Sequence, residues 1–338
     1  MRIGIVGSGS WGTALAIVLA DNAHQVEIWA RRPEQADEIN RNHTNEKYLP
    51  GVRLPDTITA SSEVEQVVKQ KEIILFVVPS HSIREVARQV KGYIPQKALI
   101  IHAIKGLELS THKRISEILL EELPNSLHER IAVLSGPSHA EEVSRRSPTT
   151  VVVASSSIHT AEEAQDALIN HHFRVYTNPD VVGLEIGGAL KNIIALGAGI
   201  SDGLQFGDNA KAALMTRGLA EISRLGVHMG ANPLTFSGLA GVGDLIVTCT
   251  SRHSRNWRAG NMLGQGHSLQ EVLSVMGMVV EGVRTTKAAY ELSFQCGIEM
   301  PITQQLYQVL FENKEPRKAV EDLMGRLKTH EMEEVAHN

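Results

Sequence analysis

The sequence is poor in the residues on which several protein classes depend. Only two of its 338 residues are cysteines, Cys249 and Cys296, too few for a disulfide framework or a cysteine-based metal site. Aromatic residues make up 4% of the chain, which leaves little material for platforms that stack nucleic-acid bases. We therefore expect no disulfide scaffold and no metal centre, and a reducing cytoplasm is the simplest expectation for its location.

Strong net charge and long apolar runs are also missing. The formal net charge is −5, whereas a protein that binds nucleic acid needs a broad basic face. The longest apolar runs, at 73–79 and 185–200, fall short of the roughly 20 uninterrupted residues that cross a membrane. The opening residues MRIGIVGSGS lack the basic, apolar and small-residue zones of a signal peptide. The sequence thus favours a soluble globular protein without a nucleic-acid partner or a membrane span.

Short apolar runs alternate with helical patterns through the first half of the chain. These runs are apolar on both faces, as in a parallel sheet that helices cover on both sides. We expect strands at 2–6, 26–30, 73–78, 98–104 and 131–134, with 150–154 and 173–177 extending the same sheet.

The pattern changes near residue 179, beyond which strand-like alternation disappears. Helical stretches follow at 180–199, 209–225, 268–276, 284–296 and 302–311, with an amphipathic tail from Lys314 that fades into polar residues after about 330. A chain of this length is expected to form two domains. We predict an α/β domain over residues 1–179 and an all-α domain over residues 180–338.

Three glycines connect the first predicted strand to the first predicted helix. Gly7, Gly9 and Gly12 form a G-x-G-x-x-G pattern in the strand–turn–helix context of a dinucleotide-binding Rossmann fold. In such a site the first glycine permits the tight turn, the second lets a pyrophosphate approach the backbone, and the third lets helix and strand pack closely. The alternative is a glycine-rich turn without a ligand. Ser10 and Trp11 lie where the loop would face the cofactor, although Trp11 is equally suited to packing.

Nineteen residues after Gly12 the chain reads Arg31-Arg32, where an NAD-selective site usually offers a carboxylate to the ribose. The nearest acid before them, Glu27, falls inside the predicted strand. Two guanidinium groups at this position suit a 2′-phosphate. We therefore favour NADP(H) over NAD(H) without excluding NAD(H), and the alternative is a solvated basic pair on a surface loop.

A lysine stands in the middle of the apolar helical run EIGGALKNIIALGAGI, residues 185–200. A buried, unpaired charge is costly, so Lys191 needs a partner, an exit to solvent or a function. Its helical face is rich in glycine and alanine, which implies that either another helix or a ligand approaches closely. Burial would move the pKa of this ammonium down towards the range of a general base. The alternative is a structural lysine paired with Glu185 or Asp244.

Two loops leave the carboxyl ends of predicted strands with polar residues, where ligands bind in open parallel sheets. Lys105 follows the strand at 98–104 and suits a substrate oxygen or phosphate; otherwise it is a surface lysine. Ser135-Gly136-Pro137-Ser138 follows the strand at 131–134. Ser138 could instead serve only as a helix N-cap.

The stretch GLAGVGDLIVTCTSRHSRN, residues 238–256, is a further cluster. Its glycines predict a loop flexible enough to press backbone against a ligand, with Asp244 at its end. Ser254, Arg255 and Asn256 offer hydroxyl, guanidinium and amide donors in succession, which suits a phosphate. The alternative is a basic loop in solvent.

Several of these blocks, in this order, resemble the bacterial-type NAD(P)-dependent glycerol-3-phosphate dehydrogenases. The matching stretches are GSGSWGTALA, AIKGLE, LSGPSHAEEV, EIGGALKNIIALGAGI, FSGLAGVGDLIVTCTSRHSRN and VVEGVRT. The resemblance implies an N-terminal Rossmann domain, an all-helical substrate domain and a homodimer. It also implies reversible conversion of dihydroxyacetone phosphate to sn-glycerol 3-phosphate, which supplies glycerophospholipid synthesis.

The resemblance also assigns residues to the site. Beside the three glycines, it implies cofactor contacts at Ser10, Trp11, Arg31, Arg32, Tyr48, Lys105, Ala140, Arg255, Val279 and Glu281. It implies substrate contacts at Lys105, Gly136, Ser138, Lys191, Asp244, Ser254, Arg255 and Asn256. It makes Lys191 the proton acceptor, with Lys105 and Asp244 assisting, and it leaves open whether Asn192 touches substrate or only ties its helix to a neighbouring backbone.

Two other functions compete with this interpretation. A β-hydroxyacid dehydrogenase of the 6-phosphogluconate type also joins a Rossmann domain to helices carrying Lys and Asn, but with a longer spacing than Lys191-Asn192. A non-catalytic NADP sensor would need only the N-terminal features, whereas Lys191, Asp244 and Arg255 are all present here.

Overall fold

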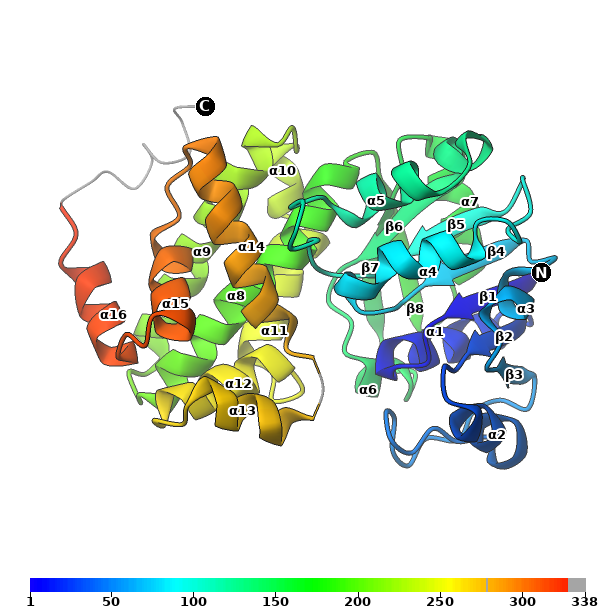
Figure 1. The fold of residues 1–338 in the computed structure, drawn as a ribbon, viewed down its shortest axis with the longest axis horizontal. Coiled ribbons are helices and arrows are strands. Elements are labelled where there is room, and N and C mark those ends of the chain that lie inside the picture. Colours follow the sequence, from blue (N-terminus) through cyan, green and yellow to red (C-terminus); the bar gives the residue numbers. More distant parts are fainter. Residues whose placement is uncertain (278, 328–338) are drawn as a thin grey trace. The chain divides into compact units, whose positions relative to one another are not determined.

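The computed structural model describes residues 1–277 and 279–327, which form two compact units (Figure 1). The first unit comprises Met1–Ile104 and Ile115–Val181, and the second comprises Lys105–Arg114 and the chain from Val182 onward. A short segment from within the first unit's sequence therefore packs as part of the second. The functional division at residues 179 and 180 stays a prediction, and the polar tail after about residue 330 lies outside the described residues.

The first unit contains one eight-stranded sheet with the order β3-β2-β1-β4-β5-β6-β7-β8. Its strands are β1 (Arg2–Val6), β2 (Gln25–Trp29), β3 (Ile58–Ser61), β4 (Ile73–Phe76), β5 (Leu99–His102), β6 (Ile131–Ser135), β7 (Thr149–Ala154) and β8 (Phe173–Asn178). The predicted α/β Rossmann-type sheet and its extension by the last two strands are confirmed, and β3 was not predicted. The sheet is parallel, as predicted, except that β6 and β7 pair antiparallel. The connection between them holds only the single-turn helix α6 (Ala140–Val143), so the chain reverses direction there.

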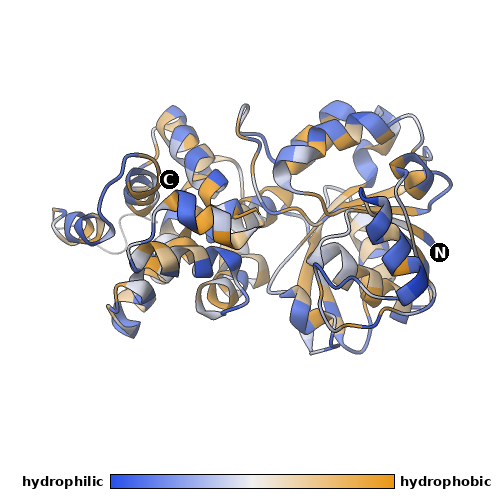
Figure 2. Ribbon diagram, turned by 60° about the horizontal axis from the view of Figure 1, so that its bottom comes forward, coloured by the Kyte–Doolittle hydropathy of each residue, from blue (hydrophilic) through white to orange (hydrophobic). Residues whose placement is uncertain are grey.

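Side chains alternate between two cores along the strands. In β4, Ile73 and Leu75 join one hydrophobic core, whereas Ile74 and Phe76 join the other. This period of two explains why the strands are apolar on both faces and mainly orange in Figure 2. The first core is covered by α1 (Ser10–Asp21), α2 (Pro33–Asn42), α6 and α7 (Ile158–Leu168). The second is covered by α3 (Val64–Val68), α4 (Ile83–Val90) and α5 (Ile115–Glu122), and the short turns η1 (Ser80–Ser82) and η2 (Asn125–Arg130) complete the unit.

The second unit is helical in its described part, as predicted, and surrounds the buried helix α8 (Val181–Gly203). The other elements are α9 (Asp208–His228), α10 (Pro233–Phe236), the π-helical turn η3 (Leu239–Gly243), α11 (Asp244–Thr250), α12 (Arg255–Gly264), α13 (Leu269–Met276), α14 (Glu281–Cys296), α15 (Pro301–Phe311) and α16 (Pro316–Met324). The flexible glycine loop predicted from residue 238 to Asp244 is wrong, since Leu239–Gly243 form a π-helical turn that leads directly into α11. Its glycines serve close packing: a Cβ on Gly241 would lie 2.0 Å from the Phe236 carbonyl oxygen.

Neighbouring backbone, rather than empty space, occupies the small-residue face of α8. A Cβ on Gly187 would lie 2.6 Å from the Ala240 carbonyl oxygen, and a Cβ on Gly199 would lie 2.0 Å from that of Trp257. The small residues on this helix could have made room either for another helix or for a ligand. At these two glycines the structure shows that they make room for the backbone of neighbouring helices.

Two segments are long and apolar enough to cross a membrane by composition alone. They are α8, with a mean hydropathy of 1.5, and Pro233–Thr250, with 1.2. The helix α8 has 23 residues and so extends beyond the apolar run at 185–200 at both ends. Within the most apolar window of α8, 89% of the residues are buried inside the protein, against 44% for the second segment. Burial of this extent is what the central helix of a globular unit shows, so its length is weak evidence for a membrane span.

Candidate functional site

A buried carboxylate in the second unit holds two lysines. Asp244, the first residue of α11, is 1% exposed. One of its oxygens, Oδ1, accepts a hydrogen bond from Lys191 Nζ on α8, and Oδ2 accepts one from Lys105 Nζ at 2.7 Å. The side chain of Lys191 is 6% exposed and that of Lys105 is 21% exposed. Lys191, Lys105 and Asp244, which the sequence places far apart, therefore form one cluster.

Thr248 completes this cluster and was missed by the sequence analysis. It lies one helical turn after Asp244, and its buried hydroxyl accepts from Lys191 Nζ at 2.7 Å while donating to the Asp244 carbonyl oxygen at 2.6 Å. The signal that could have found it is the i, i+4 spacing, which puts residues on the same side of a helix. With two acceptors fixed on α11, the ammonium of Lys191 is held in one orientation.

Burial and neighbouring charges act on Lys191 in opposite directions. Burial disfavours the charged ammonium and lowers the pKa of Lys191 to about 7, with the Lys105 charge acting in the same sense and the Asp244 charge opposing it. The two lysines hold the pKa of Asp244 below its usual range despite its burial. Lys191 can therefore gain and lose a proton near neutral pH beside a carboxylate that stays ionised.

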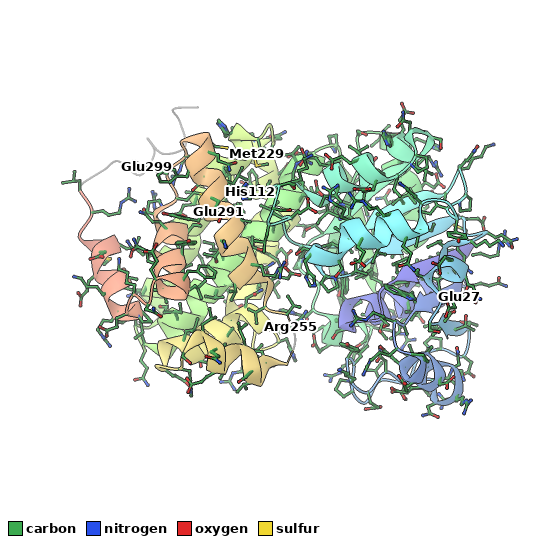
Figure 3. All side chains as sticks on the ribbon, in the orientation of Figure 1. Glu27, His112, Met229, Arg255, Glu291 and Glu299 are labelled. Carbon is green, nitrogen blue, oxygen red and sulfur yellow. The ribbon has the colours of Figure 1, made fainter. Side chains whose placement is uncertain are left out.

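The segment that carries Lys105 makes two further polar contacts within the second unit. Arg114 Nη1 donates to Glu185 at 2.7 Å, and His112 Nε2 lies 3.0 Å from Glu291 on α14 (Figure 3). The carboxylate of Glu185, on α8, is buried. Of the two acids considered as partners of Lys191, Glu185 therefore pairs with Arg114, and Asp244 pairs with Lys191.

Asn192 and Asn256 link α8 to α12. Asn256 Nδ2 donates to Asn192 Oδ1 at 2.8 Å, and Asn256 Oδ1 accepts from the Gly282 amide at the start of α14, also at 2.8 Å. Asn192 thus ties its helix to a side chain rather than to the backbone of a neighbouring element. Because Asn192 follows Lys191 and Asn256 follows Arg255, this link fixes the lysine relative to the N-terminus of α12.

Ser254 and Arg255, which with Asn256 were predicted to bind a phosphate, lie at the N-terminus of α12. Ser254 is the N-cap, and its hydroxyl accepts from the Trp257 amide at 3.2 Å. Arg255 is exposed, and its Nη1 lies 3.4 Å from the Val279 carbonyl oxygen (Figure 3). Glu281 is half-buried and begins α14. A helix N-terminus beside a guanidinium is a favourable place for a phosphate.

In the first unit, the three glycines of the G-x-G-x-x-G pattern lie in different surroundings. Gly7 has a φ of +129°, and a Cβ there would lie 2.6 Å from the Val77 carbonyl oxygen. A Cβ on Gly12 would lie 2.0 Å from the Gly7 carbonyl oxygen, whereas a Cβ on Gly9 would meet nothing within 4 Å. The first glycine therefore serves the turn, the third serves close packing, and the second faces open space. This arrangement fits a dinucleotide whose pyrophosphate approaches Gly9 at the N-terminus of α1.

Ser10 and Tyr48 come together beside this loop. Ser10 Oγ donates to the Tyr48 carbonyl oxygen at 2.6 Å. Trp11 is half-buried and packs against the first core of the unit, which supports the packing interpretation of its side chain. The first intrahelical bond of α1 runs from the Thr13 amide to the Gly9 carbonyl. The amides of Ser10, Trp11 and Gly12 precede that bond and point from the helix end.

Arg31 and Arg32 follow β2 and are both exposed, and Arg32 is the N-cap residue of α2. Among the residues that the structure describes, neither arginine is part of an ion pair. Glu27 lies within β2, as predicted, and its carboxylate pairs with Lys71 at 2.6 Å (Figure 3). Glu27 is therefore engaged elsewhere, and the acid nearest to the arginines in the sequence is Glu34, in the first turn of α2.

The loop after β6 holds Gly136, Ser138 and Ala140. Gly136 has a φ of +125° and packs against Val151, and Ser138 Oγ donates back to the Gly136 carbonyl oxygen at 2.9 Å. The alternative of Ser138 as a helix N-cap is wrong, because His139 is the N-cap residue and Ala140 begins α6.

Comparisons with known proteins agree along nearly the whole chain. Residues 2–161 match the family described as NAD-dependent glycerol-3-phosphate dehydrogenase N-terminus, and residues 180–321 match the corresponding C-terminus. A glycerol-3-phosphate dehydrogenase (NAD(P)+) of Bacillus cytotoxicus is 62% identical, covering 99% of this chain and 98% of that protein. A solved glycerol-3-phosphate dehydrogenase from Coxiella burnetii is 40% identical with a TM-score of 0.91, covering 96% of this chain and 99% of the other. The Saccharomyces cerevisiae enzyme is 29% identical with a TM-score of 0.82, at 96% and 99% coverage.

Proposed function

The chain belongs to the NAD-dependent glycerol-3-phosphate dehydrogenase family, and from this premise we propose that it reduces dihydroxyacetone phosphate reversibly to sn-glycerol 3-phosphate with NAD(P)H. It is an oxidoreductase with a small-molecule substrate. The observation that carries the proposal is the cluster in which Asp244 binds both Lys191 and Lys105. This cluster supplies a proton-transfer group with a pKa near neutrality.

Lys191 exchanges the proton of the substrate's C2 oxygen. In the direction of reduction its ammonium donates to the oxygen, and in the direction of oxidation its neutral amine accepts from the alcohol. Asp244 and Thr248 orient the amine, and the partly exposed Lys105 helps to orient the alcohol. NAD(P)H, when bound, would supply the hydride that reduces C2.

The substrate phosphate is held at the N-terminus of α12 by Arg255, Ser254 and Asn256. The side-chain amide of Asn256 already bonds Asn192 and Gly282, so its contribution includes fixing the helix end. Binding of the phosphate, remote from C2, holds the reacting carbon in position relative to Lys191. Gly136 and Ser138 belong to the substrate contacts that the family resemblance implies.

Residues 1–179 form the dinucleotide-binding domain and residues 180–338 the substrate domain in this proposal. Gly7, Gly9, Gly12, Ser10 and Trp11 receive the pyrophosphate end of the cofactor. Tyr48, Lys105, Ala140, Arg255, Val279 and Glu281 are the other cofactor contacts that the resemblance implies. The exposed and unpaired Arg31 and Arg32 support a preference for NADP(H) over NAD(H).

A homodimer in the cytoplasm, supplying phospholipid precursors, completes the proposal. The family resemblance supports the dimer and the metabolic role. Both cysteines are free thiols in the structure, in keeping with a reducing compartment. Sedimentation velocity of the purified chain tests the dimer directly.

The experiment that tests the function is a steady-state assay of NADPH and NADH oxidation with dihydroxyacetone phosphate. We expect Lys191→Ala to abolish turnover while NADPH binding, measured by fluorescence, stays close to that of the wild type. The control is Lys211→Ala, since Lys211 is a half-buried lysine of the same unit that pairs with Asp202 at 2.8 Å. Wild-type turnover in the Lys191 variant would refute its role, and tight NADPH binding without oxidation in the wild type would favour the sensor.

A further inference from the structure

Two buried amide side chains converge on the glycine loop of the first unit. Asn45 is 0% exposed and Gln35 is 5% exposed. Both donate to the carbonyl oxygen of Ser8, Asn45 Nδ2 at 2.9 Å and Gln35 Nε2 at 3.0 Å. Asn45 Nδ2 also donates to Thr13 Oγ1 at 2.8 Å, and its Oδ1 accepts from Gln35 Nε2 at 3.1 Å. The Ser8 carbonyl is thus fixed from two elements, α2 and the segment that follows it.

The direction of the Ser8 carbonyl determines the direction of the next amide. Ser8 C=O and Gly9 N–H belong to one peptide group, and in a planar trans peptide they point to opposite sides. No cis peptide bond occurs in the described chain. By holding the carbonyl inward, the two side chains turn the Gly9 N–H outward, on the glycine where a Cβ would meet nothing within 4 Å.

The same contacts connect the two ends of the cofactor site. Gln35 lies in the first turn of α2, three residues after Arg32, so its bonds tie that helix end to the glycine loop. The Asn45 carbonyl accepts from the amides of Tyr48 and Leu49, at 3.1 and 2.8 Å. The loop for the pyrophosphate and the arginines for the 2′-phosphate are therefore held in register by one buried network.

We infer that Asn45 and Gln35 are positioning residues for the dinucleotide, which keep the Ser8–Gly9 peptide oriented for the pyrophosphate. This inference rests on the proposed function only in requiring that the first unit bind NAD(P)H. Neither side chain needs to touch the cofactor, since both act through the backbone of the loop. An amide is required at residue 45 because the side chain must donate twice and accept once, which a carboxylate cannot do.

The test is Asn45→Asp, which keeps the shape of the side chain and replaces its donor by an acceptor. Gln35→Met removes the second donor at similar volume, and it keeps the test interpretable if the first variant folds poorly. The matched control is Asn22→Asp at the other end of α1, where Asn22 Nδ2 donates to the carbonyls of Ala167 and Ile169 at 2.9 and 3.1 Å. Dissociation constants for NADPH and NADH are measured by fluorescence without substrate, together with Tm, kcat and the KM for dihydroxyacetone phosphate.

We expect the dissociation constants of both cofactors to rise about tenfold or more in Asn45→Asp and by a smaller factor in Gln35→Met. The kcat at saturating cofactor and the KM for dihydroxyacetone phosphate should change less than about twofold, because Lys191 and Arg255 are untouched. The inference is overturned by wild-type cofactor affinity in both variants, by an equal loss of affinity in Asn22→Asp, or by a wild-type chain that binds no dinucleotide. A wild type that binds NADPH but leaves dihydroxyacetone phosphate unreduced would refute the proposed function alone, and the affinities would still decide this inference.

Discussion

Replacing Asp244 by asparagine should shift the pH dependence of catalysis downward. Asp244 is 1% exposed, and its charge is the main influence that opposes the lowering of the Lys191 pKa by burial. Asparagine keeps the size of the side chain and removes the charge. An opposite charge in direct contact changes a pKa by about 1 to 3 units, so the pKa of Lys191 should fall from about 7 to about 4 to 6.

The consequence for the rate follows from which form of Lys191 is active in each direction. In the proposed mechanism, reduction needs the ammonium, and with a pKa of about 7 about half of the wild-type lysines carry it at pH 7. A downward shift of one unit leaves about a tenth protonated and slows reduction about fivefold, and a shift of two units slows it about fiftyfold. The rate of reduction should recover as the pH is lowered towards 5, and the rise of the oxidation rate with pH should begin at lower pH than in the wild type.

The assay is kcat/KM for dihydroxyacetone phosphate from pH 5 to 9 at constant ionic strength, because this ratio reports the free enzyme. Asp202→Asn is the control, since Asp202 forms a comparable lysine pair, with Lys211, away from the cluster. Asn at residue 244 also leaves two lysines without their counter-charge, a change that costs about 3 to 5 kcal/mol in buried pairs, so folding is verified by urea unfolding. A midpoint that stays near 7, or that rises, would refute the assignment of the titration to Lys191.

Three further predictions test other parts of the molecule. Gly9→Ala should change the free energy of unfolding by less than about 1 kcal/mol but raise the NADPH dissociation constant about tenfold or more. Gly12→Ala should instead lower the free energy of unfolding by more than about 2 kcal/mol, because its Cβ would lie 2.0 Å from a carbonyl oxygen. Equal losses of stability in the two variants would contradict this. Replacing Arg31 and Arg32 together by alanine should raise the KM for NADPH about tenfold and that for NADH less than about twofold, so an equal rise would argue for a solvated basic pair. Burial raises the pKa of Glu221 from its ordinary value of 4.5 to about 7, so the protonated side chain should stabilise the fold most below pH 4.5, and this stabilisation should be lost as the pH rises through 7. The difference in Tm between the wild type and Glu221→Gln, measured from pH 4 to 8, should therefore change with pH over that range. A difference that stays constant would show that the carboxylate titrates normally.

The sheet and most long helices could be predicted because they depend on local pattern. Strands covered on both faces read as continuous apolar runs, and helices such as 209–225 and 302–311 have a clear period. The reversal between β6 and β7 could not be predicted, since the apolar pattern of a strand does not encode the direction of its neighbour. Nor could the packing of Lys105–Arg114 with the second unit, which depends on contacts of Arg114 and His112 with residues far along the chain.

The structural roles of the glycines were the hardest feature to predict from the sequence. The segment 238–244 looks like a flexible loop because it is rich in glycine, but Gly241 is required there by the close approach of other backbone, as Gly187 is in α8. Only Gly9 faces open space in the fingerprint, and only there does the missing side chain leave room for a ligand. The role of a glycine is thus decided by what would meet its Cβ, which is information from tertiary structure.

The sequence left two interpretations of Lys191, a structural ion pair and a proton-transfer group, and the structure shows the ion pair with Asp244. A lysine buried without a partner would lose its proton well below neutral pH, and one paired with a carboxylate at the surface would keep it well above. Asp244 shares its charge between Lys191 and Lys105, so that it opposes the effect of burial without cancelling it, and the pKa of Lys191 falls to about 7. The ion pair is therefore compatible with the proposed catalytic function, because the pair is what keeps the pKa of this buried lysine near 7, where the side chain can both donate and accept a proton.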